Sequence, residues 1–130
     1  MSSSNLVYGM PPQLQRGEIW RVNFNPAIGS EIQKIRPAII VSSDQTIGHP
    51  VRLVVPLTGW DSRYEQITWI VPVENTTSNG LDKKSAADTT ATRSVSISVE
   101  RFKEKLGILE PETLALVVAT LARVIQFRHQ

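Results

Sequence analysis

One stretch of the sequence places an acidic and a basic side chain just ahead of an apolar segment. Glu31 follows Gly29 and Ser30, and Arg36 comes five residues later, directly before Pro37. A guanidinium can make a forked contact to a phosphate, and a carboxylate can accept a proton. Taken alone, this spacing is more typical of a surface loop with solvated charges.

A second apolar segment ends at Thr58 and is followed by a polar loop with two aromatic residues. That loop contains Trp60, Arg63 and Tyr64. If the two apolar segments form adjacent strands, Arg36 and Thr58 meet at one mouth of the sheet. Sequence does not give strand order, so this proximity is a hypothesis.

Several common catalytic arrangements are missing from the sequence. The chain has no cysteine, which excludes disulfides, thiolate zinc sites and a cysteine nucleophile. His49 lies in a turn-like Gly-His-Pro segment and His129 is the next-to-last residue, so we expect both to be solvated. No ligand pair has metal-site spacing, and no phosphate-binding glycine loop or nucleophile elbow is present. We therefore expect no metal and no cofactor.

The length of 130 residues fits one domain, and the net charge of +2 is too small to predict a polyanionic partner. Residues 1–14 are predicted to be a flexible tail, without the pattern of a signal peptide, and residues 15–130 a single domain. No apolar run approaches the ~20 residues that span a bilayer, so we expect no membrane association.

Short strands dominate the predicted secondary structure. Trp20, Val22 and Phe24 alternate with polar residues from Glu18 onward, which is the period of a half-buried strand. Trp20 and Trp69 are predicted to be core residues. Further strands are predicted over residues 37–42, 51–57, 68–73 and 94–98. Several short strands joined by loops favour a small barrel or a curled sheet.

Two helices are predicted to close the chain. Ser98 can cap a helix over residues 99–106, and Gly107 can end it. Pro111 suits the first position of a second helix that runs to Phe127. This second helix is apolar almost all round, so we expect it to be buried in the domain or at a dimer contact.

Short motifs along most of the chain resemble the successive motifs of the MazF/PemK toxin family. The resemblance spans about residues 15 to 125, and its order and spacing are specific although each motif is short. The matching segments are Arg16-Gly17-Glu18-Ile19-Trp20, Asn25-Pro26, Gly29-Ser30-Glu31, Arg36-Pro37-Ala38-Ile39-Ile40-Val41-Ser42, Val54-Val55-Pro56-Leu57-Thr58, Gly80-Leu81, Ser85, Arg101-Phe102 and Gly107.

The resemblance implies a mainly β (α+β) fold, an SH3-like small β-barrel with two C-terminal helices, working as a homodimer. It implies the toxin of a type II toxin–antitoxin system, a cytoplasmic endoribonuclease that cuts single-stranded RNA, often mRNA, at specific sequences. The partner would be a smaller acidic antitoxin, with DNA reached only through the antitoxin complex. The family's catalytic arginine and threonine fall on Arg36 and Thr58, and its loop glutamate and serine on Glu31 and Ser30.

In this reading RNA supplies its own nucleophile, the 2′-hydroxyl. Arg36 would stabilise charge at phosphorus, because an arginine is a poor general base. Glu31 is proposed as the base, although a solvated loop acid is an equally good interpretation. Thr58 would position the phosphate.

The RNA-binding candidates come from two loops. Trp60 and Tyr64 are predicted to stack unpaired bases, with Trp60 in the core as the alternative, and Arg63 lies between them. Lys83 and Lys84 are candidates for phosphate contacts, and a solvated lysine pair is the alternative.

The chain departs from the family pattern before the first predicted C-terminal helix. Where the family has Gln-x-Arg, this sequence has Ala91 and Arg93, with about two extra residues before Val99. Arg93 is retained as an RNA-binding candidate, but a shifted register would remove it.

Two other functions remain open at this point. One is a gyrase-inhibiting toxin of the same fold (CcdB-like), which the C-terminal sequence Phe127-Arg128-His129-Gln130 disfavours because that branch resembles chains that end in Trp-Gly-Ile. The other is a non-catalytic SH3-like binding module.

Overall fold

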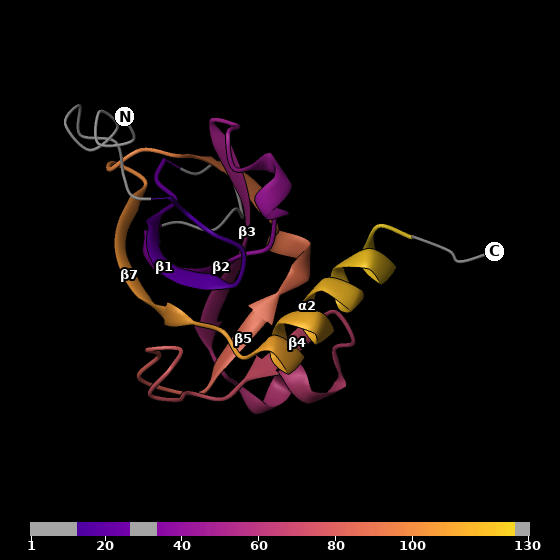
Figure 1. The fold of residues 1–130 in the computed structure, drawn as a ribbon. Coiled ribbons are helices and arrows are strands. Elements are labelled where there is room, and N and C mark those ends of the chain that lie inside the picture. The colour runs from indigo at the N-terminus through magenta and orange to yellow at the C-terminus, as the bar shows by residue number, and fades with distance from the viewer. Residues whose placement is uncertain (1–12, 27–33, 127–130) are drawn as a thin grey trace.

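A computed structural model describes residues 13–26 and 34–126. These residues form seven strands, three short 3-10 turns and one α-helix, coloured along the chain in Figure 1. The elements are β1 (Glu18–Asn23), β2 (Ile35–Ile40), β3 (Val51–Gly59), β4 (Ile70–Val73), β5 (Ser85–Asp88), β6 (Arg93–Ser96), β7 (Phe102–Ile108) and α2 (Pro111–Val124).

All strand pairs are antiparallel, in the order β4-β5-β3-β2-β1-β7, and β6 pairs with β3 off this path. The sheet is strongly curled, with β7 arching around β1 (Figure 1). Within the described ranges its two end strands, β4 and β7, do not pair with each other. The architecture is therefore the curled-sheet form of the predicted barrel, and it is not closed.

Both faces of the central strands are buried, which explains their continuous apolar runs. Alternate residues of β2 enter different cores: Ile39 packs with one cluster, and Ala38 and Ile40 with the other. β1 divides in the same way between Ile19 and Trp20. The period of two along each strand thus fills two cores with one sheet.

Helix α2 covers the core that contains Ile19 and Ile39, and it begins at Pro111 as predicted. Its buried face, centred on Val117, packs against the sheet, whereas Leu116 is 50% exposed and Ile125 is 70% exposed. Within this chain α2 is therefore buried on one face only, and the alternative, a dimer contact, stays a prediction. No helix in the described part of the chain is long and apolar enough to cross a membrane.

The predicted helix over residues 99–106 is wrong, because this segment forms strand β7. Ser98 does act as a cap, but of a single turn: its carbonyl accepts from Arg101 and Phe102, at 3.1 and 2.9 Å. The chain then extends along β1, and the Phe102 ring packs edge-on against Trp20. One C-terminal helix, not two, is present among the described residues.

Smaller corrections concern single residues and one strand. Leu14, the last residue of the tail expected from the sequence, is 1% exposed and packs in the core that contains Trp20 and Phe24. Trp20 is buried as predicted, but Trp69 is 44% exposed. Strand β5 was not predicted, because its sequence Ser-Ala-Ala-Asp carries no large apolar residue.

The loop between β4 and β5 is organised by one buried amide. Asn79 is fully buried, and its Oδ1 accepts from the backbone N–H groups of Thr76 and Leu81, both at 3.0 Å. Its Nδ2 donates to the Glu74 carbonyl at 2.8 Å and to Glu110 Oε1 at 3.2 Å. A hydrogen bond from Thr76, with help from Asn79, lowers the pKa of Glu110 below its usual value. The loop is thereby tied to the start of α2.

Two glycines allow the same loop to lie directly against β7. Gly80 has φ +73°, and a Cβ built there would lie 1.9 Å from the Leu106 carbonyl oxygen. A Cβ at Gly107 would lie 2.3 Å from the Ser78 carbonyl oxygen. Backbone therefore contacts backbone at this point, with no room for a side chain on either segment.

We expect Gly80→Ala to lower the free energy of unfolding by about 2–4 kcal/mol, because it adds both a backbone clash and a strained φ. Gly48→Ala is the matched control: an added Cβ there has no atom within 4 Å. It should change stability by less than about 0.5 kcal/mol. Urea unfolding of both variants measures the difference, and equal stabilities would show that the loop does not need this close approach.

Candidate active site

Arg36 and Thr58 are brought together by the register of β2 and β3. Ala38 faces Pro56 in this antiparallel pair, and continuing the register by two residues places Arg36 opposite Thr58. Beyond Pro56, β3 no longer pairs with β2. On its other side it pairs there with β5, beginning with Leu57 opposite Ala87. The ends of β2 and β3 are therefore not joined by a ladder, and a pocket lies between them. The two strands are adjacent and both side chains line this pocket, as the hypothesis of neighbouring strands predicts.

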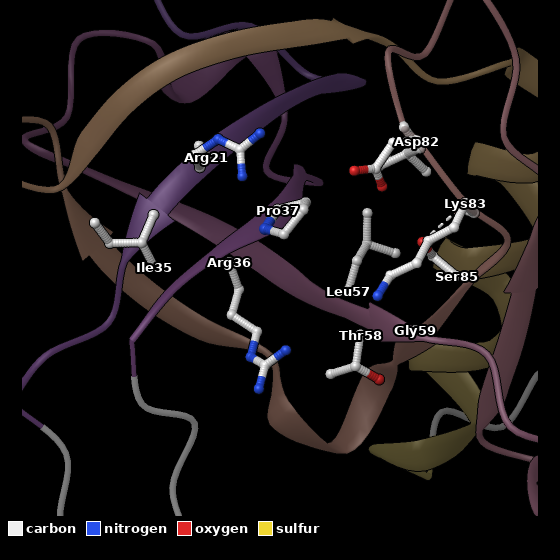
Figure 2. Close-up of a pocket in the computed structure, with 11 residues that line it drawn as sticks. Arg21, Ile35, Arg36, Pro37, Leu57, Thr58, Gly59, Asp82, Lys83 and Ser85 are labelled. Atoms are coloured by element: carbon white, nitrogen blue, oxygen red, sulfur yellow. Dashed lines mark hydrogen bonds between the residues drawn. The ribbon is translucent and has the colours of Figure 1, made fainter.

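The pocket has a volume of about 190 Å³ and is shown in Figure 2. Its walls come from β1, from the ends of β2 and β3, and from the loop that enters β5. The lining residues are Arg21, Ile35, Arg36, Pro37, Leu57, Thr58, Gly59, Leu81, Asp82, Lys83 and Ser85.

The charges of the lining residues favour an anionic occupant. Three cationic side chains, Arg21, Arg36 and Lys83, face one carboxylate, that of Asp82. Arg21 also pairs with Glu104 at 3.2 Å, on the neighbouring strand β7. Arg21 and Asp82 carry no local signal in the sequence, because strand pairing and the folded loop bring them to the pocket.

Arg36 holds an unsatisfied hydrogen-bond donor. Its Nε is buried and has no hydrogen-bond partner among the described residues. A buried donor without an acceptor costs about 1–3 kcal/mol. A phosphate whose two oxygens accepted from Nε and from a neighbouring Nη would make the forked contact that guanidinium groups favour. The side chain is thus arranged to gain from an oxyanion in this pocket.

Ser30 and Glu31 lie outside the described residues, but the chain on both sides of their segment is well anchored. Asn25 Oδ1 accepts from the Lys34 N–H at 2.8 Å, and the Phe24 N–H donates to the Lys34 carbonyl at 3.0 Å. Arg101 Nη1 donates to the carbonyls of Asn23, at 2.9 Å, and of Asn25. The described residues on either side of positions 27–33 are therefore joined to each other by hydrogen bonds.

The aromatic candidates lie just beyond the end of β3. Trp60 is half-buried and packs edge-on against Tyr64, with ring centroids 5.7 Å apart. Arg63 is turned back onto Asp61, at 3.0 Å, and this hydrogen bond lowers the pKa of Asp61. Trp60 is thus neither a core residue nor fully exposed, and none of the three candidates lines the pocket.

Lys83 and Lys84 are separated by the fold although they are adjacent in sequence. Lys83 lines the pocket, and Figure 2 shows Thr58 between the side chains of Lys83 and Arg36. The Lys84 ammonium lies 4.7 Å from the centroid of the Trp60 ring and 3.5 Å from Glu74 Oε2.

Arg93 does not line the pocket. It begins β6 opposite Val54, toward the other half of β3, and its guanidinium lies over the Phe24 ring at 5.6 Å. A 3-10 turn, Thr89–Ala91, that Asp88 caps precedes this strand.

Among the described residues, no group of three or more His, Asp or Glu side chains is close enough to hold a metal ion. The lining residues therefore include a strong anion-binding set and no metal-binding set.

Comparisons with known proteins show the family of the chain. A family model described as PemK-like, MazF-like toxin of type II toxin–antitoxin systems matches residues 15–125. The endoribonuclease MazF9 of Mycobacterium tuberculosis is 33% identical over 111 residues, covering 78% of this chain and 87% of the relative.

Solved structures share the fold. MazF from Deinococcus radiodurans superposes with a TM-score of 0.69 at 19% identity, covering 89% of this chain and 96% of that chain. A mycobacterial endoribonuclease in complex with its cognate antitoxin gives 0.67 at 18% identity, covering 90% and 99%. With its sequence matched from the start of β1 to the end of α2 and its fold shared, the chain belongs to the PemK-like, MazF-like toxins of type II toxin–antitoxin systems.

Proposed function

We propose that this toxin is a sequence-specific endoribonuclease that cuts single-stranded RNA, mRNA included, by transesterification at the 2′-hydroxyl without a metal ion. The observation that carries the proposal is the pocket in which Arg36, with its unsatisfied Nε, lies opposite Thr58. The endoribonuclease name of the 33% identical relative supports it. The gyrase-inhibiting and simple binding alternatives leave this arrangement without a use.

In the proposed reaction the ribose 2′-oxygen attacks phosphorus and loses its proton to a base. The bond from phosphorus to the 5′-oxygen breaks, and that oxygen takes up a proton. The products are a 2′,3′-cyclic phosphate and a 5′-hydroxyl. Negative charge grows on the phosphoryl oxygens in the transition state, and the Arg36 guanidinium stabilises it through paired donors.

The remaining catalytic roles follow from chemistry and from position. An arginine cannot serve as the base because its guanidinium stays protonated. We retain Glu31, five residues before Arg36 in the sequence, as the proposed base, and Ser30 as its neighbouring contact. Thr58 hydrogen-bonds and positions the phosphate from the end of β3.

Unpaired bases are proposed to stack on the aromatic pair that follows β3. Trp60 and Tyr64 are both half-buried, so each keeps some ring surface open to solvent. Base–aromatic stacking contributes about 1–3 kcal/mol per base. Arg63 and Arg93 would contact RNA outside the pocket.

We further propose that the toxin works in the cytoplasm, where its RNA substrate is found, and that a cognate antitoxin inhibits it there. DNA would be reached only through the toxin–antitoxin complex. Helix α2 leaves apolar side chains such as Leu116 and Ile125 exposed, and we propose that a second copy of the chain covers them in a homodimer.

The purified protein should cut single-stranded RNA in excess EDTA and leave a 2′,3′-cyclic phosphate and a 5′-hydroxyl. A substrate with a deoxyribose at the cleavage position should not be cut, because the nucleophile is gone. End-group analysis of the fragments checks both points. A 5′-phosphate end, or a requirement for magnesium or manganese, would contradict the proposed chemistry.

Arg36→Ala should lower the cleavage rate constant kcat by about 10²–10³-fold, the usual effect of losing a preorganised donor. Binding of uncleavable RNA should stay within about tenfold, because the contact is strongest in the transition state. Arg36→Lys should recover little, since an ammonium cannot make the forked contact. Single-turnover kinetics and a binding titration separate the two effects. A variant that loses affinity for RNA but keeps its kcat would show that Arg36 does not act on the reacting phosphate.

Light scattering at micromolar concentration should give about twice the 14.5 kDa mass of the chain. Leu116→Lys should shift the equilibrium toward the monomer if the exposed face of α2 takes part, because an exposed leucine is replaced by a charge. A wild-type mass of one chain would rule out the homodimer.

A further inference from the structure

The two adjacent lysines of the loop before β5 have different surroundings. Among the described residues, Lys84 pairs with Glu74 and lies over Trp60. Lys83 lines the pocket, and no ion pair or side-chain hydrogen bond engages its ammonium in the described ranges. A cation that faces a pocket and is not engaged by an ion pair is available to an anionic ligand.

The place of the Lys83 side chain depends on the residue that it crosses. A Cβ built on Gly59 would lie 3.2 Å from Lys83 Cε and 3.2 Å from its Nζ. Gly59 has no positive φ that would itself require glycine. The missing side chain at position 59 therefore makes room for the end of Lys83 beside the last residues of β3.

The Lys83 backbone is also held in place. Ser85 Oγ donates to the Lys83 carbonyl at 3.0 Å, and Ser85 itself pairs with both Gly59 and Val73. The Trp60 N–H donates to the Lys84 carbonyl at 3.0 Å, which continues the contact with the β3 end. The segment thus runs alongside β3, with Lys83 directed into the pocket.

We propose that Lys83 is a second catalytic cation, which contacts the scissile phosphate from the side of Thr58 opposite Arg36, and that Gly59 is the positioning residue that makes room for it. This rests on the proposed ribonuclease function. Figure 2 shows the three side chains in that sequence, with Thr58 in the middle. Lys84 is not a phosphate contact but a support for Trp60.

The two cations have complementary chemistry. The Arg36 guanidinium offers a planar fork, whereas the Lys83 ammonium is a compact charge with three donors on a flexible stem. Together they hold the phosphoryl oxygens from two directions as charge grows on them. Because this charge is greatest in the transition state, Lys83 acts on kcat more than on KM.

The experiment measures kcat and KM on one RNA oligonucleotide for the full-length protein and five variants. Lys83→Met should lower kcat by about 100-fold, with KM changed less than about threefold. Lys83→Arg should retain more activity, because the charge remains. Lys103→Met removes an equal charge from an exposed position on β7 outside the pocket, and should leave both constants unchanged.

Gly59→Ala tests the positioning role. The added methyl group meets only the flexible end of Lys83, so the protein should fold normally while kcat falls by about three- to tenfold. In the Lys83→Met background the same substitution should change kcat by less than about twofold, since the side chain that it displaces is gone.

Wild-type protein that fails to cut RNA would overturn the proposed function itself. If the wild type cuts, the inference about Lys83 is overturned by a Lys83→Met variant that keeps its kcat or loses only affinity. An equal loss in Lys103→Met would also overturn it, because the effect would then be one of net charge. If Gly59→Ala lowers kcat as much in the Lys83→Met background as in the wild type, Gly59 does not act by positioning Lys83.

Discussion

The antiparallel register between β2 and β3 is the constraint on which the pocket depends. Because Ala38 faces Pro56, the strands deliver Arg36 and Thr58 to the same level. A slip of one residue would turn every buried side chain of a strand to its opposite face. Both faces of this sheet pack against cores, so such a slip is strongly disfavoured. The apolar interior thus fixes the spacing between a guanidinium and a hydroxyl at the surface.

Alternation and apolar runs were enough to predict β1, β2, β3, β4 and β6, because those strands are built around buried side chains. They were not enough for β7, in which Phe102 is the only fully buried residue and three charged residues follow it. Such charges suit the exposed edge of a sheet, and there they resemble a solvated helix as closely as a strand. The missed β5 is formed by small residues whose conformation is imposed by its neighbours on both sides.

The sequence predicts only those site residues that lie at the ends of strands or within family motifs. Arg36 and Thr58 were found because each stands where an apolar run begins or ends. Lys83 and Lys84 could not be told apart, since neighbouring residues of an extended segment point to opposite sides, and the sequence does not show which side faces the pocket. Arg21 and Asp82 arrive through strand pairing and loop folding, which no local pattern encodes.

The loop that carries Lys83 packs against residues that come later in the chain. Gly80 lies against the carbonyl of Leu106, and Asn79 hydrogen-bonds to Glu110. Every residue that lines the pocket precedes position 86, whereas these two residues that contact the loop come after position 105. A chain that ended at residue 105 would therefore carry every lining residue of the pocket but would lack the Leu106 and Glu110 contacts that support the loop of Lys83.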